Sequence, residues 1–326
     1  MIYSRIPLAH LPTRIEHLAR LSETLGAPQI YCKRDDQTGL GFGGNKTRKL
    51  EYLLGDALQQ GARTLVSMGA IQSNHCRQVA AVAARAGLNC ILVLSGTPPA
   101  IATGNLYLDQ LFGAEVVWAD RENRQQVLEE TVKQAQYEGR APYMIPYGGS
   151  NEVGVMGYYE AMRELREEEQ QLGLSFDWIV TASSSGGTQA GMLLGALAWQ
   201  FTGRILGIAI EGSAEELGAI VHNLVTAAMS ANGLDFAFDK HLIHVNDSYT
   251  GAGYGVMGKP EIEAIRMFAS QEGLLLDPVY TGRAAAGLID LVRKGYFDKD
   301  EKVLFWHTGG TPALFAEPYL SKLQQF

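Results

Sequence analysis

A lysine near the start of a predicted helix has the surroundings of an amine nucleophile. The segment 43–50, GGNKTRKL, ends a loop with two glycines and an asparagine, and Asn45 is a natural N-cap. Apolar residues at helical spacing from Leu50 to Leu58 predict that an amphipathic helix follows. Lys46 then falls in the first turn, at the positive end of the helix dipole, where cations are disfavoured. Because partial desolvation would disfavour the ammonium form further, we expect Lys46 to be reactive.

The segment 69–75, GAIQSNH, leads from a predicted strand into a helix start. Ser73 and Asn74 are good N-caps, and the backbone N–H groups at such a terminus bind a carboxylate readily. Simple capping explains these two residues about equally well. His75 is either a proton carrier or an ordinary first-turn residue.

The segment 183–188, SSSGGT, lies between another predicted strand and helix. Its small residues would let backbone N–H groups and hydroxyl groups approach a phosphate at the helix N-terminus. The segment matches neither GxxxxGK[ST] nor GxGxxG, so it does not specify a nucleotide, and a glycine-rich turn without a ligand is the alternative. The candidate phosphate ligands are Ser183, Ser184, Ser185, Gly186, Gly187 and Thr188.

Two C-terminal segments, 277–282 (DPVYTG) and 305–310 (FWHTGG), complete this set. Tyr280 is either a buried core aromatic or a face on which a planar ring stacks. The seven histidines lack a ligand spacing such as HExxH, so we expect no catalytic metal. A reactive lysine, a phosphate cradle, a carboxylate-binding helix end and an aromatic platform together favour pyridoxal 5'-phosphate as the cofactor.

The composition argues against two classes of partner. The chain has 326 residues, a formal net charge of −8 and a pI of about 5.4, which provide no electrostatic footprint for nucleic acid or an anionic membrane. The longest apolar stretch, near residues 190–201, is too short to span a bilayer, and charged residues interrupt any N-terminal signal-peptide core. Three cysteines without paired spacing fit a reducing compartment. We therefore expect a soluble cytoplasmic protein.

Short apolar runs alternate with helical patterns along the chain, which predicts an α/β fold with doubly wound, mostly parallel sheets. More than one sheet is expected, because eight predicted strands exceed the usual size of a sheet. The predicted strands are Ile30–Lys33, Thr64–Met68, Cys90–Leu94, Glu115–Trp118, Tyr143–Ile145, Trp178–Ala182, Arg204–Ile210 and Lys302–Trp306. The predicted helices include Asn74–Ala86, Arg124–Glu138, Gly187–Gln200 and Ile262–Glu272.

Two further segments bear on the organisation of the chain. The loop 148–151, GGSN, is the best internal candidate for a domain boundary. The charge-rich run 163–171 is expected to be the solvated end of a helix.

Five segments resemble the family of D-cysteine desulfhydrases and 1-aminocyclopropane-1-carboxylate (ACC) deaminases, which are pyridoxal-phosphate enzymes: KRDD at 33–36, GGNKTRKLE at 43–51, IQSNH at 71–75, DPVYTG at 277–282 and HTGG at 307–310. The resemblance covers nearly the whole chain and implies the tryptophan synthase β-like fold (fold type II) with two doubly wound domains. It implies a larger cofactor-binding domain from residues 1–48 and 159–326 and a smaller inserted domain from residues 49–158. A homodimer is also implied.

The resemblance assigns roles to individual positions. Lys46 would hold the cofactor through a Schiff base and move the substrate α-proton, and Asn74 would contact the phenolic oxygen of the cofactor. Tyr280 would pack on its ring, and the loop 183–188 would hold its phosphate. The expected catalytic residues are Lys46, Ser73, Tyr254 and Tyr280, and the expected substrate-binding residues are Ser73, Asn74, His75 and Tyr254.

Two expected cofactor-binding positions separate the subfamilies. ACC deaminases carry Glu where Thr281 stands and Leu where Thr308 stands. A hydroxyl near the ring nitrogen strengthens the electron sink less than a carboxylate does, which suits α,β-elimination better than opening a cyclopropane ring. The expected substrate is a small amino acid, D-cysteine first, which would give pyruvate, ammonia and hydrogen sulfide. The alternatives are an L-cysteate lyase, an ACC deaminase, or a non-catalytic protein that binds small anions.

Overall fold

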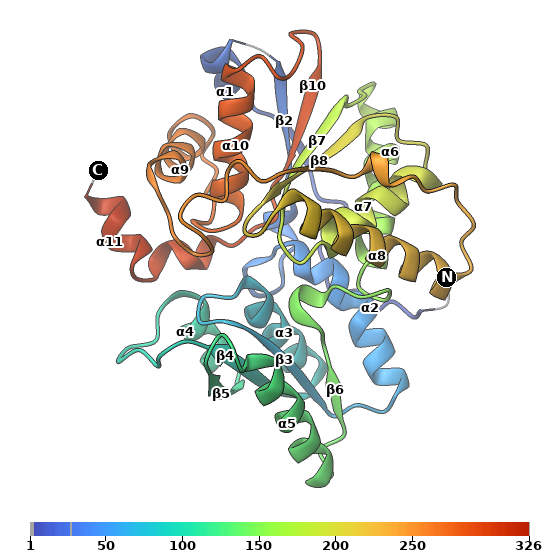
Figure 1. The fold of residues 1–326 in the computed structure, drawn as a ribbon, viewed down its shortest axis with the longest axis vertical. Helices are drawn as coiled ribbons and strands as arrows, with labels where there is room; N and C mark the ends of the chain where they lie inside the picture. The colour runs from blue at the N-terminus through green and yellow to red at the C-terminus, as the bar shows by residue number, and fades with distance from the viewer. Residues whose placement is uncertain (1–2, 27, 326) are drawn as a thin grey trace.

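The computed structural model describes residues 3–26 and 28–325 and contains two sheets (Figure 1). The larger has six strands in the order β1-β2-β10-β7-β8-β9, and only β1 and β2 are antiparallel neighbours. The smaller has four parallel strands in the order β5-β4-β3-β6. The prediction of an α/β fold with more than one mostly parallel sheet is therefore confirmed.

The strands that were predicted form within two residues of the expected bounds. The six-stranded sheet consists of β1 (Ile15–His17), β2 (Gln29–Lys33), β10 (Lys302–Trp306), β7 (Trp178–Ser183), β8 (Arg204–Ala209) and β9 (His244–Asn246). The four-stranded sheet consists of β5 (Glu115–Ala119), β4 (Asn89–Ser95), β3 (Thr64–Ala70) and β6 (Pro142–Met144). The edge strands β1 and β9 were not predicted, because three residues are too few to display an alternating pattern.

Helices cover both sheets, as the apolar strands require. They are α1 (Ala19–Leu25), α2 (Asn45–Gln59), α3 (Asn74–Ala86), α4 (Gly104–Leu111), α5 (Arg124–Tyr137), α6 (Met156–Leu172), α7 (Gly187–Ala198), α8 (Ala214–Asn232), α9 (Lys259–Glu272), α10 (Thr281–Arg293) and α11 (Tyr319–Gln324). Single 3₁₀ turns occur at η1 (Asp35–Gln37), η2 (Leu40–Phe42), η3 (Tyr147–Gly149), η4 (Lys240–Leu242) and η5 (Thr311–Phe315). No helix among the described residues is long and apolar enough to cross a membrane.

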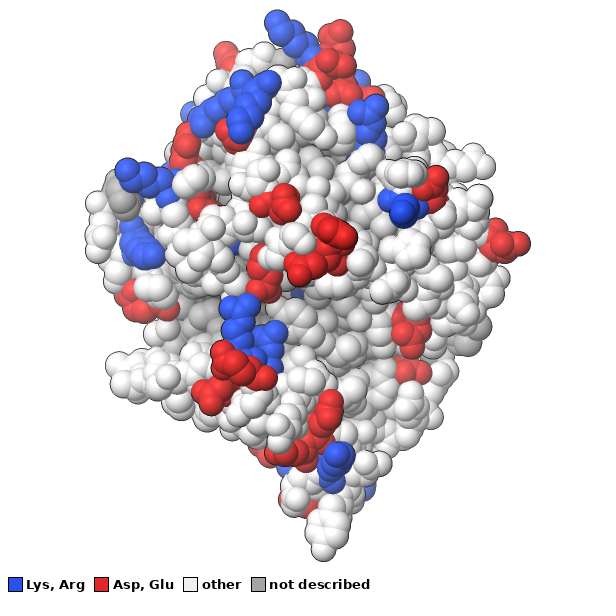
Figure 2. All heavy atoms as spheres, viewed as in Figure 1, with Lys and Arg blue, Asp and Glu red and all other residues white. Residues whose placement is uncertain are grey.

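The chain passes between the two sheets in α2 and again between η3 and α6. The predicted domain boundaries after residues 48 and 158 fall inside α2 and α6, and the division itself stays a prediction. Where the half with the six-stranded sheet meets the half with the four-stranded sheet, acidic and basic side chains lie next to one another (Figure 2). One such pair joins the halves, because Arg121 after β5 donates to Glu211 after β8 at 2.6 Å.

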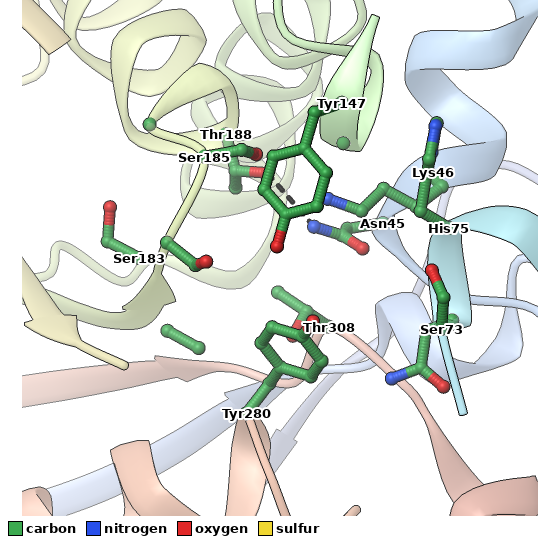
Figure 3. A pocket seen from close by; sticks show the side chains of 15 residues that line it. Asn45, Lys46, Ser73, His75, Tyr147, Ser183, Ser185, Thr188, Tyr280 and Thr308 are labelled. Atoms are coloured by element: carbon green, nitrogen blue, oxygen red, sulfur yellow. Dashed lines mark hydrogen bonds between the residues drawn. The ribbon is translucent and has the colours of Figure 1, made fainter. Parts of the chain in front are cut away.

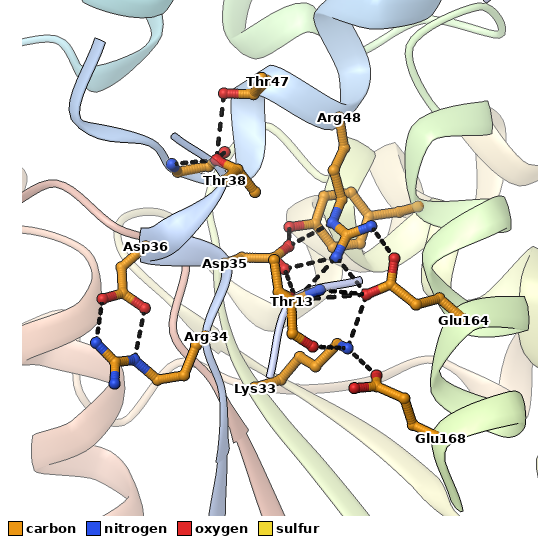
Figure 4. A network of polar contacts seen from close by, with 12 residues as sticks. Thr13, Lys33, Arg34, Asp35, Asp36, Thr38, Thr47, Arg48, Glu164 and Glu168 are labelled. Atoms are coloured by element: carbon orange, nitrogen blue, oxygen red, sulfur yellow. Dashed lines mark hydrogen bonds and ion pairs between the residues drawn. The ribbon is translucent and has the colours of Figure 1, made fainter. Parts of the chain in front are cut away.

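A buried ionic network fixes α2 to the six-stranded sheet and α6 (Figure 4). Arg48 of α2 donates to both carboxylate oxygens of Asp35, at 2.8 and 2.9 Å, and to both of Glu164, at 2.8 and 2.9 Å. Lys33 of β2 pairs with Glu164 at 2.7 Å and also with Glu168. The interpretation of the run 163–171 as a solvated helix end was therefore wrong for its inner face, which sequence alone cannot orient.

Candidate active site

A pocket opens where the carboxyl ends of strands from both sheets meet, as expected for ligand sites in open α/β folds (Figure 3). Side chains and loops that are far apart in the sequence line it. They come from the start of α2, the turn after β3, η3, the turn after β7, and the residues that precede α10 and follow β10: Asn45, Lys46, Ser73, Asn74, His75, Tyr147, Gly148, Ala182, Ser183, Ser184, Ser185, Gly186, Thr188, Tyr280 and Thr308.

Lys46 is the second residue of α2 and points into this pocket (Figure 3). The prediction that Asn45 is the N-cap was wrong: Gly44 holds that position, with φ +124°, and Asn45 is already helical. The Asn45 side chain instead donates to Thr188 Oγ1 at 2.9 Å, across to the loop after β7. Lys46 nevertheless lies in the first turn as predicted.

The electrostatics of Lys46 fit an amine that must lose its proton. Burial lowers its pKa to about 8, because the ammonium form loses hydration. Among residues 3–26 and 28–325, no carboxylate lies within 4.0 Å of its Nζ. About a tenth of the amine is therefore in the nucleophilic form at pH 7, far more than for an ordinary lysine.

The start of α3 forms a second wall of the pocket. Ser73 is the N-cap and accepts a hydrogen bond from the N–H of Cys76 at 3.1 Å, which confirms its capping role. The N–H groups of Asn74 and His75 precede the first intrahelical bonds, so they are free to face an anion.

The His75 ring is buried and forms a hydrogen bond with the side chain of Ser67. Ser67 donates its one hydroxyl proton to the carbonyl of Ile145 at 2.9 Å, so its 2.9 Å contact with His75 requires His75 Nε2 to be the donor. Burial, and then the charges of Lys46 and Lys49, keep the pKa of His75 well below its usual value. His75 is therefore a neutral ring, and the structure favours its backbone N–H over its ring as a contact for substrate.

The loop after β7 has the features of a phosphate cradle. Gly186 is the N-cap of α7, with φ +75°, and no side chain caps the free N–H groups there. Ser183 is 2% exposed, lines the pocket, and its hydroxyl has no partner among the described residues. Gly187 does not itself line the pocket, but a β-carbon at this position would lie 2.8 Å from Lys49 Nζ.

Lys49 is a functional candidate that has no distinctive signal in the sequence. Its side chain is fully buried, and its Nζ donates to the carbonyl of Gly148 and to Ser150 Oγ, both at 3.2 Å. Burial, and then the charge of Lys46, lower its pKa well below the usual value. A buried cation with only neutral partners is costly, so an anion beside the start of α7 would complete its surroundings.

Two tyrosines line the remaining side of the pocket, and a third contacts one of them. Tyr280 lines the pocket as predicted, and its hydroxyl lies 2.7 Å from that of Tyr254, which is not a lining residue. Tyr147 was missed, although it directly precedes the glycine pair of the loop 148–151. Sequence marked that loop as a boundary, and only the fold turns its tyrosine toward the pocket (Figure 3).

The two threonines expected near the cofactor ring differ in position. Thr308 lines the pocket, whereas Thr281 lies behind Tyr280 and is fully buried. Thr281 Oγ1 donates to Asp277 Oδ1 at 2.8 Å and accepts from the Asp277 N–H at 2.7 Å. The role of Thr281 toward a cofactor stays a prediction, as do the roles of Thr308 and the other candidate residues.

These surroundings fit pyridoxal phosphate. The unpartnered Ser183 hydroxyl, the uncapped start of α7 and buried Lys49 suit a phosphate, and Lys46 suits the cofactor aldehyde. No group of three His, Cys, Asp or Glu side chains that could hold a metal ion occurs within the described parts of the chain.

Comparisons with known proteins agree with this geometry. The chain is 43% identical over 321 residues to a D-cysteine desulfhydrase of Salmonella newport, covering 96% of each chain. It is 41% identical over 316 residues to a Pyrococcus abyssi protein provisionally named a 1-aminocyclopropane-1-carboxylate deaminase, covering 96% of this chain and 93% of that protein. A crystal structure of an ACC deaminase homologue superposes with a TM-score of 0.90 at 39% identity, covering 99% of this chain and 96% of that one.

The family assignment follows from a match that runs through most of the chain. Residues 6–309 match the family described as pyridoxal-phosphate dependent enzymes, which includes both the Lys46 segment and the loop 183–188. The alternative of a non-catalytic anion-binding protein is therefore not retained. The chain belongs to the pyridoxal-phosphate dependent enzymes, with their fold type II architecture.

Proposed function

We propose that this enzyme catalyses α,β-elimination of D-cysteine to pyruvate, ammonia and hydrogen sulfide. The observation that carries the proposal is the 43% identity to a D-cysteine desulfhydrase along 96% of both chains. The arrangement of Lys46, the start of α3 and the Tyr254–Tyr280 pair around one pocket supports the same chemistry.

The residues that would hold the cofactor come from both halves of the molecule. Lys46 would carry it, and the loop from Ser183 to Thr188, with Lys49 behind it, would bind its phosphate. Asn74 would face its phenolic oxygen, and the ring edge would lie near Thr308, with Thr281 behind. When bound, pyridoxal phosphate supplies an electron sink that acidifies the substrate α-hydrogen and allows a β-substituent to leave.

Substrate binding and proton removal are assigned to two neighbouring helix starts. The free N–H groups of Asn74 and His75, with Ser73 beside them, would receive the substrate carboxylate. Lys46, whose pKa of about 8 leaves part of it neutral at physiological pH, would accept the α-proton.

The tyrosine pair is suited to donate a hydrogen bond to the leaving sulfur. Burial raises the pKa values of Tyr254 and Tyr280 above the usual range, so both keep their protons. Two hydroxyls that share one hydrogen bond leave one O–H free to donate a second. We assign that hydrogen bond to the departing thiolate, whose negative charge it would stabilise.

A substrate panel tests the proposal. Purified protein loaded with pyridoxal phosphate would be given D-cysteine, L-cysteine, L-cysteate, D-serine and ACC, with pyruvate, α-ketobutyrate and sulfide measured. We expect sulfide and pyruvate in equal amounts from D-cysteine. Turnover of ACC alone, or of L-cysteate alone, would overturn the substrate assignment.

ACC ring opening is a second candidate, favoured by the TM-score of 0.90 to the ACC deaminase homologue. Thr281 and Thr308, where ACC deaminases are expected to carry Glu and Leu, count against it. Because Thr281 already contacts Asp277, a carboxylate at this position would bring two buried anions together.

We further propose a homodimer located in the cytoplasm. The three cysteines of the chain are unpaired and buried, which supports a reducing compartment. Light scattering on the cofactor-loaded protein would test the dimer, with a mass near twice 35.5 kDa as the expected result.

A further inference from the structure

The side-chain amide of Asn74 is held in one orientation at the pocket wall. Its Oδ1 accepts a hydrogen bond from Asn105 Nδ2 at 2.8 Å, on the side away from the pocket. The Nδ2 atom of Asn74 faces Gly310: a β-carbon added to Gly310 would lie only 2.5 Å from this nitrogen. The group that Asn74 can offer to a ligand is therefore a donor, provided that this orientation is fixed.

Asn105, in the first turn of α4, fixes the orientation of the Asn74 amide by donating to its oxygen. Asn105 is fully buried; its Oδ1 accepts from Arg77 Nε at 2.7 Å, and its Nδ2 also donates to the carbonyl of Gln72 at 2.9 Å. A guanidinium has no acceptor and a carbonyl has no donor, so both partners impose the same orientation on the Asn105 amide. Asn105 can then only donate to Asn74.

Arg77 is the fixed end of this chain of hydrogen bonds. It is fully buried, and its Nη2 donates to the carbonyl of Gly43 at 3.1 Å, three residues before Lys46. Its Nη1 and both carboxylate oxygens of Asp109 have no hydrogen-bond partner among the described residues. Neither Asp109 nor Asp277 is hydrogen-bonded to Arg77, and burial raises the pKa of Asp109 to about 8, so this carboxyl is largely uncharged at neutral pH. Burial lowers the pKa of Arg77 to about 10, so Arg77 stays a cation.

We propose that Arg77 and Asn105 are positioning residues which hold the Asn74 amide so that the cofactor meets a hydrogen-bond donor at its phenolic oxygen. The two hydrogen bonds, from Arg77 to Asn105 and from Asn105 to Asn74, both have the donor on the side away from the pocket and the acceptor nearer to it. Aligned bonds that begin at a buried cation polarise one another, so the last donor favours an anionic acceptor. The proposal rests on the cofactor placement given above and is independent of which substrate is used.

The Asn105→Asp variant tests the chain with almost no change of shape. The new carboxylate keeps its partner Arg77 but has no proton to donate, so Asn74 must turn its NH2 toward it and offer an oxygen to the pocket. Because a donor stabilises the phenolate, we expect the pH midpoint of the visible absorbance of the loaded protein to rise by about one pH unit. Cofactor affinity, measured by fluorescence titration of the cofactor-free protein, should fall about tenfold.

Three further variants provide a control, a test of the cofactor placement and a substitute for Asn105→Asp. Asn89→Asp makes the same chemical change at an exposed site at the start of β4 and should leave the midpoint unchanged. Asn74→Ala should raise the midpoint at least as far as Asn105→Asp; if it does not, the placement of the cofactor at Asn74 fails rather than the positioning chain. Arg77→Met, which removes the cation and the donor to Asn105 Oδ1 from which the chain begins, carries the test if Asn105→Asp does not fold by circular dichroism.

An unchanged midpoint in a folded, loaded Asn105→Asp or Arg77→Met protein, with a shifted midpoint in Asn74→Ala, would overturn the proposal. A purely structural role would lower thermal stability in these variants without moving the absorbance midpoint. The spectrum therefore separates positioning from packing.

Discussion

Lys46 and Lys49 lie three residues apart at the start of α2, and the charge of Lys46 adds to burial in lowering the pKa of Lys49. Neither ammonium has a carboxylate within 4.0 Å among residues 3–26 and 28–325. Two neighbouring buried amines without acidic partners give this end of the pocket a positive potential. Such a site is completed by an anion, which the cofactor phosphate and the substrate carboxylate would supply.

Capture of the cofactor by Lys46 should depend on pH with a midpoint of about 8, the pKa to which burial lowers its amine. Below that pH the ammonium predominates, so the rate should fall about tenfold per pH unit, and above it the rate should level off. Stopped-flow absorbance, corrected for the titration of the free cofactor, measures this. Lys46→Ala should give no visible band, and a rate that keeps rising to pH 10 would contradict the assignment.

Lys49→Met should change stability and cofactor binding in opposite directions. Removal of a buried amine that has only neutral partners, and whose charged form burial disfavours, should stabilise the cofactor-free protein by about 1–3 kcal/mol in urea unfolding. Loss of a charge-assisted contact should weaken cofactor binding about 10–100-fold. Lys133→Met, on the exposed side of α5, is the matched control and should change neither; unaltered cofactor affinity in Lys49→Met would refute the phosphate role.

Tyr254→Phe should lower kcat for D-cysteine by about 10²-fold while the visible band of the cofactor persists. The reason is loss of one hydroxyl from the pair whose free O–H we assign to the leaving sulfur. With β-chloro-D-alanine, whose chloride leaves without a proton, the decrease should be several-fold smaller. Tyr249→Phe removes a hydroxyl that donates to Asp290 and serves as the control; equal losses with both substrates would exclude a hydrogen bond to the leaving sulfur.

Arg48→Met should destabilise the protein by about 3–5 kcal/mol, because it leaves the buried carboxylates of Asp35 and Glu164 without their main cation. Urea unfolding of the cofactor-free protein measures this. Arg163→Met, which removes an exposed cation paired with Glu160 and Glu167 on the outer face of α6, should cost less than about 1 kcal/mol. Similar losses in both variants would show that the network does not anchor α2.

The same network should make the free energy of unfolding decrease as the pH falls below about 4.5. Burial alone would raise the pKa of Glu164, but hydrogen bonds and charges from Arg48 and Lys33 lower it to about 2, below the ordinary value of 4.5. A carboxylate with a depressed folded pKa contributes stability above its unfolded pKa and loses it as pH falls. Unfolding free energies should thus decrease between pH 4.5 and pH 2, and less steeply in Glu164→Gln; parallel curves would contradict the ion pair.

Local sequence patterns determined most of the secondary structure and most of the residues that line the pocket. Continuous apolar strands and the glycine-rich turns after them placed Lys46, Ser73, the loop 183–188 and Tyr280 at strand ends, because periodicity and turn chemistry act over a few residues. The combination of these segments favoured pyridoxal phosphate as the cofactor, and the family match over residues 6–309 confirms it.

Tertiary structure decided what depends on contacts between distant segments. Asn45 was expected to cap its own helix, yet its amide reaches Thr188, 143 residues away. Glu164 belongs to a run that was expected to be solvated, yet it forms a salt bridge with Arg48. Lys49 is buried because segments distant in the sequence pack against it, at Gly148, Ser150 and Gly187. A sequence pattern shows which residues lie on one helix, but the burial and partners of a charge are set by the segments that pack against it, and these determine whether it stabilises the fold or binds a ligand.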